Sequence, residues 1–111
     1  MTEPVDLLRG TLDFLVLKAL TWGPKHGFEI SRWIADSTDQ ALEPEEGALY
    51  PALHRMERRG WLDAEWAMTE SSRRAKYYQL TRMGREQLKA QDRAWRRYVV
   101  VVGKILAAAK A

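Results

Sequence analysis

The stretch EEGALYPALHRMERRGW, residues 45–61, combines the apolar spacing of a short helix with an internal proline and a run of cationic residues. Its apolar residues Leu49, Leu53 and Met56 recur at i, i+4 and i+7, which places them on one side of a helix. Pro51 falls in or just beyond the first turn, where the amide that proline lacks would make little or no intrahelical hydrogen bonding. The stretch therefore predicts a helix with an apolar inner side and a basic outer side.

Two further helices are predicted upstream of this stretch. Residues 6–24 show helical apolar spacing, and Gly23 and Pro24 end the helix because proline cannot continue it. Its apolar stripe consists of Leu8, Leu12, Phe14, Leu15, Leu17, Ala19 and Leu20. Residues 26–37 predict a second, shorter amphipathic helix. Downstream, Gly60 is a typical stop for the helix of the opening stretch.

The apolar period changes to two after the third helix. WLDAEW, residues 61–66, and AKYYQLT, residues 75–81, read as two short strands. The segment between them is polar and carries two adjacent arginines, so the sequence predicts a β-hairpin with a charged tip. Trp61 and Trp66 are expected to pack in the hairpin core rather than to serve as stacking platforms.

The remaining residues predict one long helix that Thr81 can cap. Apolar residues between 82 and 111 fall near heptad spacing toward the end of the chain. The four valines at 99–102 would also suit a strand, but the helical spacing on both sides and the alanine-rich tail favour a helix.

Three helices, a hairpin and a long helix form the plan of a winged helix-turn-helix protein, so the expected fold is mainly α with a small β-hairpin. We expect residues 1–80 to form the DNA-binding domain and residues 81–111 a C-terminal dimerisation helix. That helix carries more apolar surface than a domain of this size covers alone, and a twofold dimer would bury it. The predicted dimer-interface residues are Leu88, Trp95, Tyr98, Val99, Val102, Ile105 and Leu106.

Composition excludes several classes of function. The 111 residues suit one domain with or without an extra helix, and they include no cysteine and only two histidines, His26 and His54. Disulfides, thiolate metal sites, cysteine nucleophiles and a histidine metal site are therefore not expected. With no phosphate-binding glycine loop and no serine elbow, we expect no enzyme, no metal and no cofactor.

No apolar run is long enough to span a bilayer, so we expect a soluble, cytoplasmic protein without membrane contact.

Positive charge is concentrated in the second part of the chain. Residues 1–50 hold four Lys or Arg and nine Asp or Glu, a net charge of −5, whereas residues 51–111 hold fourteen and six, a net charge of +8. This asymmetry indicates a polyanionic partner. A basic face that is merely solvated would give the same net charge. Only the arrangement of the cations can distinguish it from a binding site for a polyanion.

The candidate DNA contacts come from the third helix and the hairpin. In a winged helix-turn-helix domain the third helix enters the major groove, and the hairpin reaches phosphates or the minor groove beside it. The predicted DNA-binding residues are Gly47, Ala48, Tyr50, Pro51, His54, Arg55, Arg58, Arg73, Arg74 and Lys76. This interpretation requires Arg55, Arg73 and Lys76 to share one outward face.

Some of these residues also have structural interpretations. Arg58 and Arg59 are common as solvated charges at the end of a helix, and Tyr50 could pack across the adjoining turn. His54 is ambiguous, with cationic neighbours that favour a surface role. The arginine pair at the hairpin tip has the strongest functional case, because a basic tip beside a basic helix has no evident structural purpose.

Three stretches of the chain resemble the PadR family of bacterial transcriptional regulators. They are LLRGTLDFLVLKALTWGPKHGFEI at 7–30, GALYPALHRMERRGWL at 47–62 and RRAKYYQLTRMGREQL at 73–88. The combination of a GP-HG pair, a LYPAL helix and a KYYxLTxxG strand-to-helix junction is specific, and the match covers most of the chain. The resemblance implies a winged-helix homodimer that binds operator DNA, usually as a repressor. It also implies that the C-terminal helix mediates dimerisation, commonly by packing on the partner's N-terminal helix.

The resemblance extends to single residues. It implies that Tyr50 and Pro51 are the Tyr-Pro of the family's recognition helix. It assigns the basic wing and the strand tyrosines to Arg73, Arg74, Lys76, Tyr77 and Tyr78. Family members often carry Ser or Thr at the position of Ala48, so the resemblance does not support a side-chain hydrogen bond to DNA there. The single C-terminal helix resembles the short-tailed branch of the family, which has no separate effector domain.

The expected function is that of a sequence-specific transcriptional regulator, a homodimeric repressor of double-stranded operator DNA with a small aromatic molecule as candidate effector. Trp95 and Tyr98 are the candidate effector-binding residues, because they would line an aromatic cavity between subunits. Plain interface packing is the alternative for both. The alternative from a different class of function is an adaptor, a winged-helix module whose basic helix binds a protein partner and does not bind operator DNA.

Overall fold

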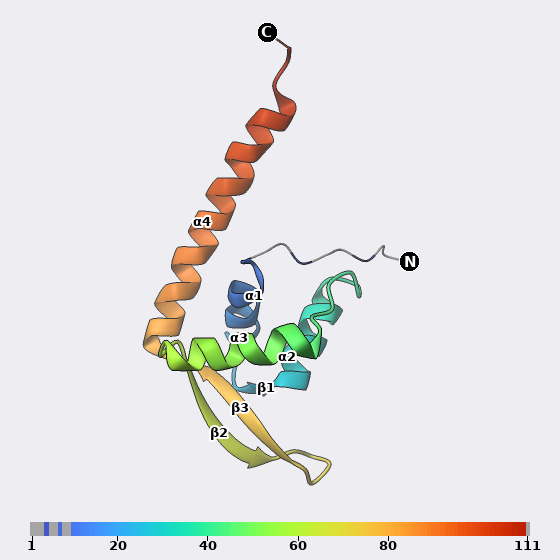
Figure 1. Cartoon of the computed structure of the whole chain (residues 1–111), viewed down its shortest axis with the longest axis vertical. Helices are drawn as coiled ribbons and strands as arrows, with labels where there is room; N and C mark the ends of the chain where they lie inside the picture. The colour runs from blue at the N-terminus through green and yellow to red at the C-terminus, as the bar shows by residue number, and fades with distance from the viewer. Residues whose placement is uncertain (1–3, 5–6, 8–9, 111) are drawn as a thin grey trace.

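The computed structural model describes residue 4, residue 7 and residues 10–110, and the described part forms four helices and a small antiparallel sheet (Figure 1). Leu8, assigned above to the first helix, lies outside the described residues. In chain order the elements are α1 (Leu12–Ala19), β1 (Lys25–His26), α2 (Gly27–Ser37), α3 (Glu46–Arg58), β2 (Leu62–Met68), β3 (Arg74–Leu80) and α4 (Arg82–Ala107). The mainly α fold with a small β element, expected from the sequence, is confirmed.

The core lies where α1, α2 and α3 meet the sheet. As predicted, Leu49, Leu53 and Met56 turn the inner side of α3 into this core. Burying an aliphatic side chain of this size stabilises the fold by roughly 1.5–3 kcal/mol relative to its exposed state. The other fully buried side chains from the helices include Val16, Leu17, Leu20, Ile30 and Ile34.

The start of α3 explains how the helix accommodates its proline. The helix begins at Glu46, so Pro51 is its sixth residue and lies in the second turn. The amide that proline lacks would have bonded to the carbonyl of Gly47, and both residues are exposed, so solvent can reach that carbonyl. Gly60 has φ +80°, which confirms it as the residue that ends the helix.

The sheet has one more strand than the predicted hairpin. Its strand order is β1-β3-β2, with all neighbours antiparallel. Strand β1 has two residues, too few to produce an alternating pattern, and it pairs Lys25 with Tyr78 and His26 with Tyr77. Strands β2 and β3 form the hairpin, or wing, and extend further toward its tip than the sequence indicated, to Met68 and from Arg74.

Helix α4 begins at a cap and ends far from the core. Thr81 is the cap, since its Oγ1 accepts a hydrogen bond from the Gly84 amide at 3.0 Å and donates one to the Gly60 carbonyl at 2.6 Å. The four valines lie inside this helix, which confirms the helical interpretation. The first half of α4 packs along α1, and its second half projects away from the body on the side opposite the wing (Figure 1). The molecule is consequently 62 Å long.

Candidate nucleic-acid interface

The outer face of α3 is exposed along its whole length. Its centre consists of Gly47, Pro51, His54 and Arg58, which recur at helical spacing. Among the described residues, no side chain forms a hydrogen bond or ion pair with His54 or Arg58. A bare helical face with an imidazole and a guanidinium suits the major groove, where such donors meet phosphates and base edges.

Tyr50 lies on the flank of α3 that faces the wing, and its ring rests against the start of α2. A Cβ placed on Gly27 would lie 2.7–2.8 Å from three atoms of the Tyr50 ring, so only a glycine leaves room for this position. The ring is 39% exposed. The ring therefore packs within the protein, but against the start of α2 and not across the adjoining turn, and part of it remains exposed.

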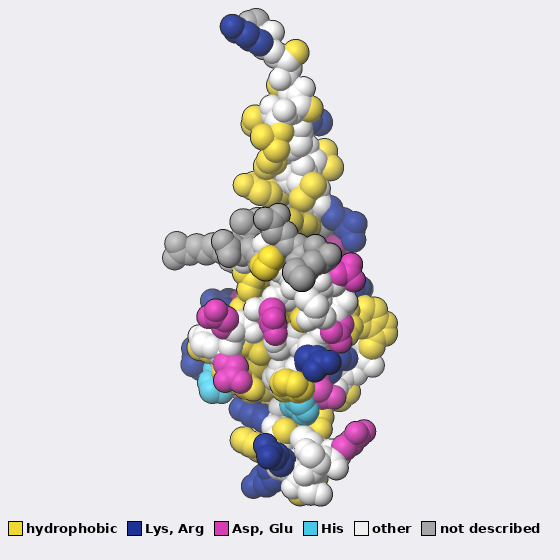
Figure 2. Space-filling model, turned by 90° about the vertical axis from the view of Figure 1, so that its right-hand side faces the viewer, with side chains coloured by type: hydrophobic (Ala, Val, Ile, Leu, Met, Phe, Trp, Pro, Cys, Tyr) yellow, Lys and Arg dark blue, Asp and Glu magenta, His cyan; other side chains and the backbone are white. Residues whose placement is uncertain are grey.

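A cleft of about 620 Å³ separates this flank of α3 and the start of α2 from the wing. It brings Tyr50 together with three of the predicted wing contacts, Arg73, Arg74 and Lys76. Lys and Arg side chains gather at the wing end of the molecule (Figure 2, lower end). The cleft thus has a helix on one side, a hairpin on the other and cations along the hairpin, an arrangement that could attract phosphate.

Trp66 is not part of the hairpin core. It is 57% exposed and lines the cleft, so the prediction that it would be buried is wrong, whereas Trp61 is half-buried against the core as expected. Trp66 is not among the residues that pack against the core cluster. Its ring instead supports Arg74, whose Cζ lies 5.2 Å from the ring centroid. This cation–π contact holds one wing arginine over an aromatic face.

Lys76 is engaged within the protein. Its Nζ donates a hydrogen bond to Oε1 of Glu57 on α3 at 2.9 Å, so the pair ties the wing to the helix. This bond raises the pKa of Lys76 above its ordinary 10.5, against the lowering effect of burial. Burial raises the pKa of the neighbouring Tyr78, and the nearby Lys76 ammonium opposes that rise.

Arg55 lies on the opposite flank of α3. Its Nη2 donates to Oδ1 of Asp13 on α1 at 2.6 Å. Residues two apart on a helix project about 200° apart, so Arg55 and Glu57 point to opposite sides. The expectation that Arg55 shares one face with Arg73 and Lys76 is therefore wrong for Arg55. Ala48, seven residues earlier, lies exposed on the same flank as Arg55.

The predicted dimer-interface residues form an apolar stripe along α4. Leu88, Trp95 and Val102 are half-buried, while Tyr98, Val99, Ile105 and Leu106 are exposed. In Figure 2 the projecting part of the helix shows hydrophobic side chains over much of its visible surface. Helix α1 covers only the first half of the stripe, at Leu88 and at Trp95, whose ring centroid lies 5.8 Å from that of Phe14.

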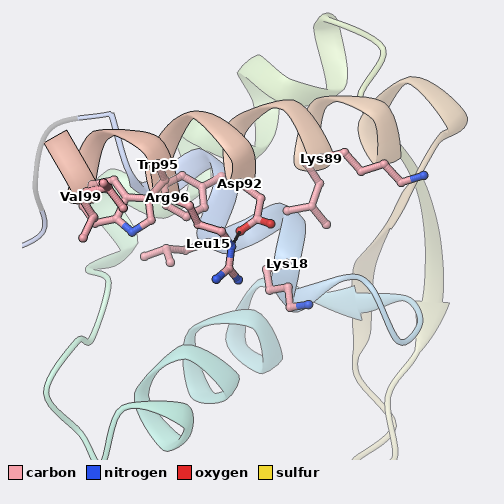
Figure 3. Close-up of a pocket in the computed structure, with 10 residues that line it drawn as sticks. Leu15, Lys18, Lys89, Asp92, Trp95, Arg96 and Val99 are labelled. Carbon is pink, nitrogen blue, oxygen red and sulfur yellow. Dashed lines mark hydrogen bonds and ion pairs between the residues drawn. The ribbon is translucent and has the colours of Figure 1, made fainter.

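Trp95 stands between two hollows at the junction of α1 and α4. The larger one, about 730 Å³, is bounded by Leu15 and Lys18 of α1 and by Asp92, Trp95 and Val99 of α4 (Figure 3). The other, about 420 Å³, has Trp95, Tyr98 and Phe14 among its lining residues. The rings of Trp95 and Tyr98 have centroids 6.3 Å apart. The hollows on the two sides of the indole are lined by apolar and charged residues together, and they could take a planar aromatic molecule or the side chains of another subunit.

Within the described residues, no three His, Asp or Glu side chains are grouped so that they could hold a metal ion. None of the helices in the described part of the chain combines the length and apolar character needed to span a bilayer.

The model of the transcriptional regulator PadR-like family matches residues 16–90 of the chain. A transcriptional regulator from Clostridium thermocellum is 31% identical, with 90% of this chain and 97% of that chain covered and a TM-score of 0.81. A PadR family regulator from Eggerthella lenta is 34% identical over 91% of this chain and 86% of that one, with a TM-score of 0.79. A PadR family regulator from Clostridium difficile is 27% identical over 88% and 100%, with a TM-score of 0.76. Family members are transcriptional regulators and not enzymes, in agreement with the composition. The chain therefore belongs to the PadR-like family of DNA-binding transcriptional regulators.

Proposed function

We propose that the protein is a homodimeric repressor that binds operator DNA with α3 and the wing of each subunit. The observation that carries the proposal is the cleft in which Tyr50 of α3 faces Arg73 and Arg74 of the wing. A DNA backbone that follows this cleft would place the outer face of α3 in the major groove and the wing against adjacent phosphates.

The roles of the predicted contacts divide into two groups. The exposed residues of α3 and the wing arginines are assigned to DNA itself: Gly47, Ala48, Tyr50, Pro51, His54, Arg58, Arg73 and Arg74. Arg55 and Lys76 are each bound to a carboxylate, so we assign them to holding α3 in place, against α1 and against the wing respectively. Residues 1–80 then form the DNA-binding domain, and residues 81–111 the dimerisation helix.

The dimer proposal rests on the exposed half of α4. Ile105 and Leu106 are 73% and 81% exposed in the single chain, and they continue the apolar stripe that α1 covers at Leu88 and Trp95 near the body. A second copy of the chain is the occupant proposed for this stripe, because a twofold axis would bury it in both copies at once. The two DNA-binding faces would then read two halves of an inverted repeat.

The effector proposal rests on the hollows beside Trp95. In a dimer, α4 of the second subunit would close them, and Trp95 and Tyr98 would stack on a planar aromatic ligand between subunits. Titration of the dimer with a panel of planar aromatic molecules tests this, with tryptophan fluorescence as the readout. A ligand should quench the wild type and leave Trp95→Leu unchanged. If no molecule in the panel quenches the wild type, Trp95 is an ordinary packing residue.

The DNA proposal is tested by binding to the promoter of the protein's own gene, with nuclease footprinting to locate the site and fluorescence anisotropy to measure affinity. We expect protection of an inverted repeat, and loss of binding in the double variant Arg73→Glu, Arg74→Glu. The matched control is Arg93→Glu, Arg97→Glu, which makes the same charge change on exposed residues of α4 away from the apolar stripe. If the two double variants bind the promoter equally well, the wing arginines do not contribute to DNA binding.

DNA binding and the adaptor alternative differ in how affinity for DNA should depend on salt concentration. A DNA-binding protein should lose affinity with a log–log slope near −0.9 per phosphate neutralised. An adaptor should show no binding to the promoter at physiological salt, whatever the sequence. Repression itself is tested by a reporter driven by that promoter, whose expression should rise when the gene for the protein is deleted.

A further inference from the structure

Two hollows of opposite charge lie on either side of the Tyr50 ring. One is the basic cleft of the wing, with Arg73, Arg74 and Lys76 along its wall. The other, at the start of α3, has the acidic residues Glu43, Glu45 and Glu46 among its lining residues. Gly27, Phe28 and Tyr50 line both hollows. The wall between the acidic and the basic hollow therefore consists of the start of α2 and one tyrosine ring.

A glycine is needed at position 27 because there is no space for a side chain, and not because of the backbone conformation. It is the first residue of α2 and its φ lies outside the left-handed region, so its backbone would accept any L-residue. A Cβ at this position would lie 2.7 Å from both Cε1 and Oη of Tyr50 and 2.8 Å from Cζ. These atoms belong to the far end of a side chain, so an added methyl group would push the ring aside while the backbones stay in place.

We propose that Gly27 is a positioning residue for DNA recognition: its missing side chain lets the Tyr50 ring stand as a fixed partition that keeps the DNA backbone on the wing side. This inference rests on the proposed function. A phosphate on the wing side meets the two wing arginines, since Lys76 is already paired with Glu57, whereas one on the other side would meet three acidic residues. A ring already held in place also loses little conformational entropy when DNA binds.

Gly27 and Tyr50 belong to two sequence motifs that lie more than twenty residues apart. The glycine belongs to the GP-HG pair and the tyrosine to the LYPAL helix. His26, just before the glycine, caps α2 through Nδ1, which accepts a hydrogen bond from the Glu29 amide at 3.3 Å, and the Glu29 carboxylate accepts from the His26 amide. The helix start that supports the ring is therefore itself held in place.

Gly27→Ala tests the proposal with two readouts. The first is the ¹⁹F NMR resonance of Tyr50 in protein labelled with 3-fluorotyrosine, assigned by its loss in Tyr50→Phe. The second is affinity for the promoter repeat. We expect a shifted Tyr50 resonance and an affinity loss of about tenfold, the value of one well-placed contact. In a Tyr50→Ala background, Gly27→Ala should cause no further loss, because there is no ring to displace.

The matched control is Gly103→Ala, the same change in a helix where a Cβ would meet nothing within 4 Å. It should leave the Tyr50 resonance unchanged. An unshifted Tyr50 resonance in Gly27→Ala, unchanged affinity despite a shift, or additive losses in the double variant would each overturn the positioning role. If the resonance shifts but the wild type itself shows no sequence-specific DNA binding, the proposed function fails, and the inference fails with it.

Discussion

The Nζ of Lys76 on the wing lies 2.9 Å from Oε1 of Glu57 on α3, so a single ion pair joins the two elements proposed to bind DNA. Glu57 thereby competes with phosphate for the lysine. We expect Glu57→Gln to raise affinity for any DNA by up to about tenfold at 0.1 M salt and to steepen the salt slope by about 0.9, since Lys76 becomes free to neutralise one phosphate.

The control for this change is Glu65→Gln. It removes the same charge from the wing, but Glu65 is on the strand face that points away from the cleft. Affinity measured between 50 and 200 mM salt should change far less for this variant. A Glu57→Gln protein with the wild-type slope would mean that Lys76 remains withdrawn from DNA even without its partner.

The same pair makes stability depend on alkaline pH. The pKa of Lys76 is raised by its bond to Glu57 and that of Tyr78 by burial, so the folded state binds these protons more tightly than the unfolded chain. Stability from these groups is complete below their ordinary pKa values of 10.5 and 10.0 and is lost as pH rises through the raised values. The melting temperature should therefore fall above pH 10, less steeply in Glu57→Gln and in Tyr78→Phe. Identical pH profiles in all three proteins would contradict this account.

Trp66 should contribute to DNA affinity through Arg74. A cation–π contact at an exposed site contributes about 0.5–1 kcal/mol, so Trp66→Ala should weaken promoter binding by about twofold to fivefold. Trp66→Phe keeps an aromatic face and should recover part of the loss. In an Arg74→Ala background, Trp66→Ala should have little further effect. Equal losses in both backgrounds would show that the indole acts on DNA independently of the arginine.

Arg55 should affect stability more than DNA binding. Its pair with Asp13 is partly exposed, so removing it by Arg55→Met or Asp13→Asn should cost on the order of 1 kcal/mol and lower the melting temperature by about 4–8 °C. The double variant should lose little more than either single one. The slope of log DNA affinity against log salt concentration should stay unchanged. A slope reduced by about 0.9 in Arg55→Met would instead identify Arg55 as a phosphate contact.

Local sequence patterns predicted the features that depend on periodicity and capping. Leu49, Leu53 and Met56 follow the helical period and are buried, Gly60 ends α3, and Thr81 caps α4. These features depend on residues close together in the chain, and the physics of one helix is enough to predict them.

The features that the sequence did not reveal depend on contacts between distant segments. Asp13 and Arg55 are 42 residues apart in the sequence. Taken separately, each of them resembles an ordinary charged residue of the surface. Gly27 and Tyr50 each belong to a recognisable motif, but nothing in either motif shows that they touch. Trp66 follows the strand alternation, yet its burial depends on which distant residues pack over the strand, and no local pattern shows that.

The exposed stripe of α4 predicts a dimer that a single charge should weaken. Val99 is 50% exposed in the single chain and lies at the centre of the stripe, so Val99→Glu would bury a carboxylate without a partner in each subunit of the proposed dimer. Light scattering at micromolar concentration should give a dimer for the wild type and a monomer for this variant. Two linked half-sites can bind 10²–10⁴ times more tightly than one, so affinity for the inverted repeat should fall by at least about 100-fold, while affinity for an isolated half-site should change little.

Arg97→Glu is the control, because it introduces the same side chain two residues earlier on the far side of the helix, about 160° from Val99. It should remain a dimer with near wild-type affinity for the repeat. A monomeric wild type would refute the dimer outright. A Val99→Glu protein that stays dimeric and still binds the repeat tightly would place the interface elsewhere, and the apolar stripe would then need another occupant.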